Sequence, residues 1–206
     1  MKRKSLFYIL FFVVLVAVFY FVLTKVAPGF VQKNIPPVGY VSPFSFINQD
    51  GKTVTEKDVE GKVFVVEYFF TTCRGICPRM NNNMKTVYEK FKNENNFLIL
   101  AHTSDPEIDS ASILKRYADS LGVSTSRWIF LTGRKDSLYN MARLSYKIDD
   151  PANNLTSVDD DFLHTQFWAL VNDKGEVKKV YDGLKESEVK ELINDIGKML
   201  RKKVKG

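Results

Sequence analysis

Hydrophobic and polar residues follow two different patterns along this chain of 206 residues, and the first pattern marks its beginning. Residues 6–23 form a run of 18 residues without a charge or a proline, preceded by Lys2, Arg3 and Lys4. A helix over this run is roughly 27 Å long at about 1.5 Å per residue, close to the hydrocarbon thickness of a bilayer. Because the run exceeds the apolar region of a cleavable signal peptide and no A-x-A pattern follows it, we predict an uncleaved transmembrane anchor.

After this run, short apolar stretches alternate with segments that are apolar on one helical face. The predicted strands cover residues 44–48, 63–70, 97–101, 128–131, 167–171 and 177–181. The predicted helices cover residues 79–91, 110–121, 137–144 and 186–203. Strands that alternate with helices, followed by a hairpin and a last helix, predict an α/β thioredoxin-like sandwich with a central mixed sheet flanked by helices.

The two patterns together predict three parts. Residues 1–25 hold the basic segment and the anchor, residues 26–42 form an extended tether rich in proline and glycine, and residues 43–206 form the thioredoxin-like domain. The basic N-terminus is expected to stay in the cytoplasm, and this orientation places the domain on the other side of the membrane.

The net charge of +6 is not evidence for a nucleic-acid partner, because of where the charges lie. Eight basic residues lie at the two ends of the chain, and the remaining body carries about −2. We therefore expect no nucleic-acid partner. The basic C-terminal end is interpreted as a solvated helix end, with anionic lipid headgroups as an alternative contact.

The only two cysteines, Cys73 and Cys77, lie on the turn between a predicted strand and a predicted helix. Pro78 suits the first turn of that helix. The helix N-terminus beside Cys77 and the charge of Arg74 predict thiols with a lowered pKa.

Four uses of this pair remain open. A structural disulfide gains little, since so short a loop has a small closure entropy. A thiol–disulfide oxidoreductase suits an exported domain, although the common redox motif has two intervening residues and this one has three. Metal binding requires a further ligand. A peroxide-reducing enzyme is suggested only by analogy of fold.

The two histidines are the candidates for that further ligand. His164 follows Asp159, Asp160 and Asp161 in a polar loop that a thioredoxin-like sheet places near the cysteine turn. Two thiolates and one imidazole suit copper, since soft thiolates select Cu(I) and structural zinc requires four protein ligands. A lone histidine is more often a surface or hydrogen-bonded residue, and His102, at a strand end, is interpreted as structural or as a partner of a ligand.

The stretch YFFTTCRGICP, residues 68–78, resembles the F-T-x-C-x-x-x-C-P motif of the Sco/SenC family of copper metallochaperones of cytochrome c oxidase assembly. Residues 103–109 are similar to the family's [ST]-x-D-P-x-x-D segment, and residues 117–131 to its helix, loop and W-x-F-L strand. His164 and Thr165 look like its D-H-[ST] motif, with Leu163 in place of the aspartate. The resemblance covers roughly residues 43–200.

The resemblance implies a membrane-anchored protein that binds copper through Cys73, Cys77 and His164, with Cys73 and Cys77 also a redox-active pair. It implies delivery of copper to the copper-site subunit of a cytochrome c oxidase, or reduction of that subunit's thiols. Other implied partners are a thioredoxin-like reductant or another copper chaperone. The alternative is a thiol–disulfide oxidoreductase of the cell envelope without a stable metal.

The expected location is a bacterial inner membrane, crossed once, with the domain on the periplasmic side. The start of the chain has no Arg-rich, Ser-rich amphipathic leader, and this favours a bacterial envelope over mitochondrial import.

Overall fold

The computed structural model describes residues 3–26, 36–149, 163 and 165–203, and the chain divides into two units, Met1–Pro36 and Pro37–Gly206. The first unit holds one helix, α1 (Arg3–Val26). Its segment Lys4–Val22 has a mean hydropathy of 2.7 and none of it is buried, so its length and composition suit a membrane span.

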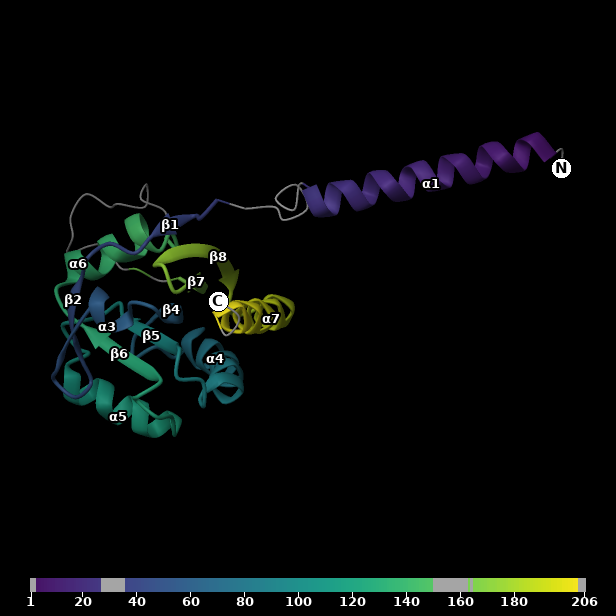
Figure 1. Ribbon diagram of the computed structural model, residues 1–206. Helices are drawn as coiled ribbons and strands as arrows, with labels where there is room; N and C mark the ends of the chain where they lie inside the picture. The colour runs from purple at the N-terminus through teal and green to yellow at the C-terminus, as the bar shows by residue number, and fades with distance from the viewer. Residues whose placement is uncertain (1–2, 27–35, 150–162, 164, 204–206) are drawn as a thin grey trace. The chain divides into compact units, whose positions relative to one another are not determined.

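The second unit is built on one mixed sheet of eight strands in the order β1-β8-β7-β4-β5-β6-β2-β3 (Figure 1). The central strands β4, β5 and β6 are parallel, and every other pairing is antiparallel. The strands are β1 (Gly39–Tyr40), β2 (Ser45–Asn48), β3 (Thr53–Thr55), β4 (Val63–Phe69), β5 (Phe97–Thr103), β6 (Trp128–Thr132), β7 (Phe167–Val171) and β8 (Glu176–Asp182).

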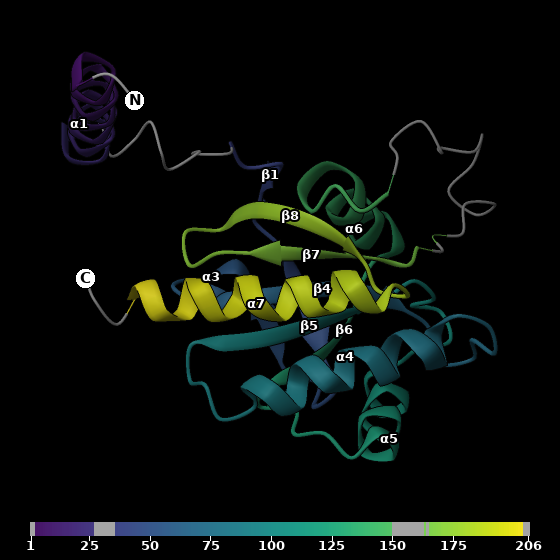
Figure 2. The same cartoon turned by 90° about the vertical axis from the view of Figure 1, so that its right-hand side faces the viewer.

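Helices cover both faces of this sheet (Figure 2). One face packs against α4 (Cys77–Phe91), α5 (Ala111–Leu121) and α7 (Glu186–Lys203). We call it the dithiol face because Cys77 belongs to its core and Cys73 packs against that core. The other face packs against α3 (Glu56–Val59), α6 (Lys135–Asn140) and a π-helical turn, η1 (Met141–Ser145), and we call it the opposite face.

The side chains of β4 and β5 alternate between these two faces, although every residue of both strands is buried. In β4, Val65 and Phe69 lie in the core of the dithiol face, whereas Phe64 and Tyr68 lie in the core of the opposite face. This alternation is the ordinary period of a strand that is covered on both sides. The parallel central strands and their helices confirm the predicted thioredoxin-like fold.

Most predicted elements are present, with small shifts at their ends. The helix predicted over residues 110–121 is α5, with Ser110 at its N-cap and Gly122 at its C-cap in the left-handed conformation, φ 66°. The helix predicted over 137–144 is α6 followed by η1. Within the predicted tether, residues 39 and 40 form β1, which pairs with the edge of β8.

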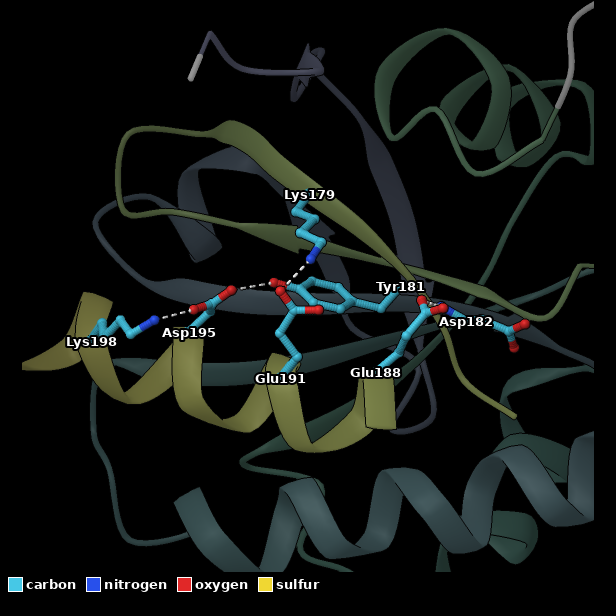
Figure 3. Close-up of polar contacts among 7 residues, drawn as sticks. All are labelled: Lys179, Tyr181, Asp182, Glu188, Glu191, Asp195 and Lys198. Carbon is cyan, nitrogen blue, oxygen red and sulfur yellow. Dashed lines mark hydrogen bonds and ion pairs between the residues drawn. The ribbon is translucent and has the colours of Figure 1, made fainter. Parts of the chain in front are cut away.

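The last helix, α7, is attached to β8 by charged and polar side chains (Figure 3). Lys179 pairs with Glu191 at 2.5 Å, and the Tyr181 hydroxyl donates to Asp195 at 2.9 Å. Asp195 also pairs with Lys198 at 2.8 Å. The backbone N–H of Asp182 donates to the Glu188 carboxylate at 2.6 Å. These contacts lie along the outer edge of the apolar contact that Leu192 and Ile196 make with the sheet.

Candidate metal centre

The two cysteines lie where β4 ends and α4 begins. Cys77 is the first residue of α4, Pro78 follows it in the first turn, and the backbone N–H of Cys73 donates to the carbonyl of Phe70 at 3.2 Å. Both cysteines are free thiols; Cys77 is buried, and Cys73 is partly exposed. The pair therefore has one thiol that a partner can approach and one that lies beneath it.

The Cys77 thiol is harder to ionise than the sequence suggests. Burial raises its pKa to about 12, with a hydrogen bond to Cys73 acting in the same direction. A backbone hydrogen bond from Phe70 to the sulfur acts the other way and does not compensate. The prediction of a lowered pKa at the helix N-terminus is thus wrong for Cys77, because removal from water outweighs the helix end.

A buried carboxyl group on the dithiol face was not singled out by the sequence analysis. Glu67 in β4 is fully buried and accepts a hydrogen bond from the Trp128 indole at 3.2 Å. Burial raises its pKa to about 8. When it is ionised, its charge further opposes ionisation of Cys77. The available signal was a single carboxylate inside the apolar run 63–70.

His164, the third predicted ligand, lies outside the described residues, as do Asp159, Asp160 and Asp161. Both of its neighbours in the chain are described and buried. The backbone N–H of Leu163 donates to the Tyr139 hydroxyl at 3.1 Å. The Thr165 hydroxyl donates to the carbonyl of Ile148 at 2.9 Å.

His102 lies in β5 on the opposite face of the sheet, within rings of Phe46, Tyr68 and Tyr146. It is fully buried, and neither ring nitrogen has a hydrogen-bond partner among the described residues. Burial lowers its pKa to about 3. This environment agrees with the structural interpretation of His102. Within the described part of the chain, no group of three His, Cys, Asp or Glu side chains is arranged to hold a metal ion.

The mixed sheet, the helices on both faces and a dithiol on the turn from β4 to α4 define a thioredoxin-like dithiol protein. The family model of SCO1/SenC matches residues 33–201. The chain belongs to the SCO1/SenC family.

Individual relatives agree with this assignment. The SCO1 protein homolog of Bacillus subtilis is 34% identical over 170 residues, which cover 80% of this chain and 86% of the relative. The solved structure of BsSco, a Sco family cytochrome c oxidase assembly protein with an identified disulfide switch, has a TM-score of 0.68 at 32% identity. It covers 82% of this chain and 99% of that chain.

A second solved structure contains the metal. The crystal structure of Arabidopsis thaliana ScoI with copper bound is similar to this chain with a TM-score of 0.62 at 27% identity. The match covers 80% of this chain and 99% of that chain. Copper is thus a metal of this family.

Proposed function

We propose that this protein is a membrane-anchored copper carrier that delivers copper to the copper site of a cytochrome c oxidase. The observation that carries the proposal is the pair of reduced thiols, Cys73 partly exposed and Cys77 beneath it, in a chain of the SCO1/SenC family. Two sulfur donors on one turn suit Cu(I), and an imidazole ligand also allows binding of Cu(II). The third ligand in this proposal is His164.

The proposed ligands must lose protons before they bind copper as thiolates. Since burial raises the pKa of Cys77 to about 12, a positive ion that takes the place of its proton favours the loss of that proton. Copper binding is therefore expected to release protons and to weaken as the pH falls. The partly exposed Cys73 is the sulfur that an acceptor dithiol can reach first, which suits exchange of the ion from one thiol pair to another.

The asymmetry of the two thiols also supports a second function, reduction of an acceptor disulfide. The Cys73 thiolate attacks one acceptor sulfur, which forms a mixed disulfide and releases the other acceptor sulfur as a thiolate. Cys77 then passes its proton to the released acceptor thiolate and attacks the Cys73 sulfur, which breaks the mixed disulfide and releases the second acceptor sulfur. The Cys73–Cys77 disulfide forms, and the acceptor leaves with both sulfurs reduced by the two electrons of the dithiol.

The substitution His164→Ala separates the two functions. We expect stable copper binding to be lost, while titration of two thiols and reduction of a disulfide substrate persist. The matched variant Cys73→Ser is expected to lose both copper binding and disulfide reduction. Copper and zinc are offered in competition to the reduced protein under anaerobic conditions, and the bound metal is counted. Full retention of copper by His164→Ala removes His164 from the site, and a preference for zinc contradicts the copper proposal.

The proposed location follows from α1 and its flanking charges. Lys4–Val22 would cross a bacterial inner membrane once, and the basic residues before it would keep the N-terminus in the cytoplasm. Residues 26–42 would then tether the domain on the periplasmic side. Deletion of residues 1–25 is expected to move the protein from the membrane fraction to the soluble fraction, and a soluble full-length protein contradicts the proposal.

A further inference from the structure

A buried carboxylate lies directly behind the cysteine turn. Asp109 has no exposed surface, and three hydrogen bonds converge on its two oxygens. The backbone N–H of Thr71 donates to Oδ2 at 3.1 Å, and the Thr71 hydroxyl donates to Oδ1. The Thr103 hydroxyl donates to Oδ2 at 2.5 Å. Hydrogen bonds to a charged acceptor are stronger than neutral ones, so this carboxylate is a firm attachment point.

The loop that carries Asp109 is itself closed by hydrogen bonds. The backbone N–H of Asp109 donates to the carbonyl of Asp105 at 2.9 Å, and the N–H of Asp105 donates to the Thr103 hydroxyl at 2.9 Å. Ser110, the next residue, is the N-cap of α5. The Asp109 carboxylate is thus held in place by contacts with the end of β5 and by its position next to the start of α5. Its orientation towards Thr71 is therefore fixed by the fold.

Thr71 shares a peptide bond with Phe70, and the backbone of Phe70 contacts the dithiol at two points. The carbonyl of Phe70 accepts the backbone N–H of Cys73 at 3.2 Å. The backbone N–H of Phe70, which belongs to the preceding peptide unit, makes the hydrogen bond to the Cys77 sulfur. Because a peptide unit is planar and rigid, the N–H of Thr71 that Asp109 holds and the carbonyl that Cys73 uses turn together.

We propose that Asp109 is a positioning residue for the dithiol: its grip on Thr71 fixes the Phe70–Thr71 peptide and thereby the relative orientation of the Cys73 and Cys77 sulfurs. The inference rests on the proposed function of these cysteines as the reactive pair. Asp109 itself touches neither sulfur in this scheme. It acts by limiting the orientations that the cysteine turn can adopt, and it thereby sets how readily the two sulfurs form a disulfide.

Two threonines on the same carboxylate provide a matched pair of variants in the full-length protein. Thr71→Val removes a hydroxyl donor on the cysteine side, and Thr103→Val removes a hydroxyl donor on the loop side. Thr103→Val also leaves the N–H of Asp105 without its acceptor, so general loosening of the fold is at least as large in this control. Thr71→Ser restores the hydroxyl, and Asp109→Asn tests the carboxylate directly.

The measurements are the equilibrium constant of the dithiol with glutathione and the rate of alkylation of Cys73 by iodoacetamide at one pH. We expect Thr71→Val and Asp109→Asn to change the equilibrium constant by about fivefold, the factor that one hydrogen bond represents. Thr103→Val and Thr71→Ser should stay close to the unmodified protein. If Asp109→Asn does not fold, the threonine pair alone decides.

An equal effect of Thr71→Val and Thr103→Val, or no effect of Thr71→Val in a folded protein, overturns the inference. Copper binding of the unmodified protein is measured in the same series with Cu(I) alone. Its absence would remove the copper proposal, while the glutathione equilibrium would still decide the role of Asp109. The two failures are therefore distinguishable.

Discussion

Glu67 and His102 lie on adjacent strands, β4 and β5, on opposite faces of the sheet. Both side chains are fully buried, and burial acts on them in opposite directions: it raises the pKa of Glu67 to about 8 and lowers the pKa of His102 to about 3. Both groups are therefore neutral near pH 7, because removal from water opposes charge of either sign.

The difference between the two lies in what surrounds them. Glu67 has one oxygen bonded to the Trp128 indole, its other oxygen has no partner among the described residues, and its charge acts on Cys77. His102 stacks on the Tyr68 ring at 5.0 Å and is enclosed by apolar groups. Glu67 is thus placed to act on the dithiol, whereas His102 is placed to affect stability.

The largest expected effect is that of Glu67→Gln on stability in alkaline solution. The folded pKa of Glu67, about 8, lies above the ordinary value of 4.5, so its contribution is complete below pH 4.5 and is lost as the pH rises to 8. The loss is about 1.4 kcal/mol per pH unit between these two values and smaller close to either of them. The variant should therefore gain on the unmodified protein by roughly 3.5 kcal/mol between pH 5 and pH 8.

Urea unfolding across this pH range measures the difference, with fluorescence of the buried tryptophans as the signal. The glutamine oxygen can still accept from Trp128, so the difference reports the charge and not the hydrogen bond. Above about pH 8 the same variant should ease ionisation of Cys77, since the charge of Glu67 that opposes it is then present. A stability difference that does not vary with pH would mean that Glu67 is not neutral in the folded protein.

His102→Leu is expected to have the next largest effect, with the opposite dependence on pH. The folded pKa of about 3 lies below the ordinary 6.5, so the contribution is complete above pH 6.5 and is lost as the pH falls towards 3. The variant should unfold with nearly the same free energy at pH 7 and be more stable by roughly 2.5 kcal/mol at pH 4.5.

Unfolding at several pH values between 4 and 7 measures this effect, and the glutathione equilibrium of the dithiol serves as the control. Since neither nitrogen of His102 has a hydrogen-bond partner among the described residues, leucine removes no observed hydrogen bond. A change in the dithiol equilibrium at pH 7 would contradict the assignment of His102 to a purely structural role on the opposite face.

Local patterns predict the helices and strands well, because each pattern depends on neighbouring residues. The predicted helix 186–203 has the same bounds as α7, and the predicted strand 63–70 is one residue longer than β4. The π-helical turn η1 is not predicted, since one altered hydrogen-bond step leaves the inward residues nearly unchanged. The two-residue strand β1 is too short to carry a period.

The features of the site also differ in whether neighbouring residues in the sequence could predict them. The spacing of Cys73 and Cys77 is local and indicates the dithiol, whereas the bond between Thr71 and Asp109 joins residues 38 apart and depends on strand pairing. The pKa prediction for Cys77 was wrong because a helix end is worth about 1 kcal/mol at most at an exposed site, and burial of a thiolate costs more. His164 stays a prediction.

Glu191→Gln is expected to have the smallest effect of these substitutions. It is the same chemical change as Glu67→Gln, made at a carboxylate that is exposed to water. Glu191 on α7 pairs with Lys179 at 2.5 Å, and both side chains are nearly half exposed, at 48% and 44% (Figure 3). Exposed ion pairs contribute little, so Glu191→Gln should change the free energy of unfolding by less than about 0.5 kcal/mol. The change should shrink further in salt. The urea series used for Glu67→Gln measures it. An effect of Glu191→Gln as large as that of Glu67→Gln would show that burial of the carboxylate is not what separates Glu67 from the surface.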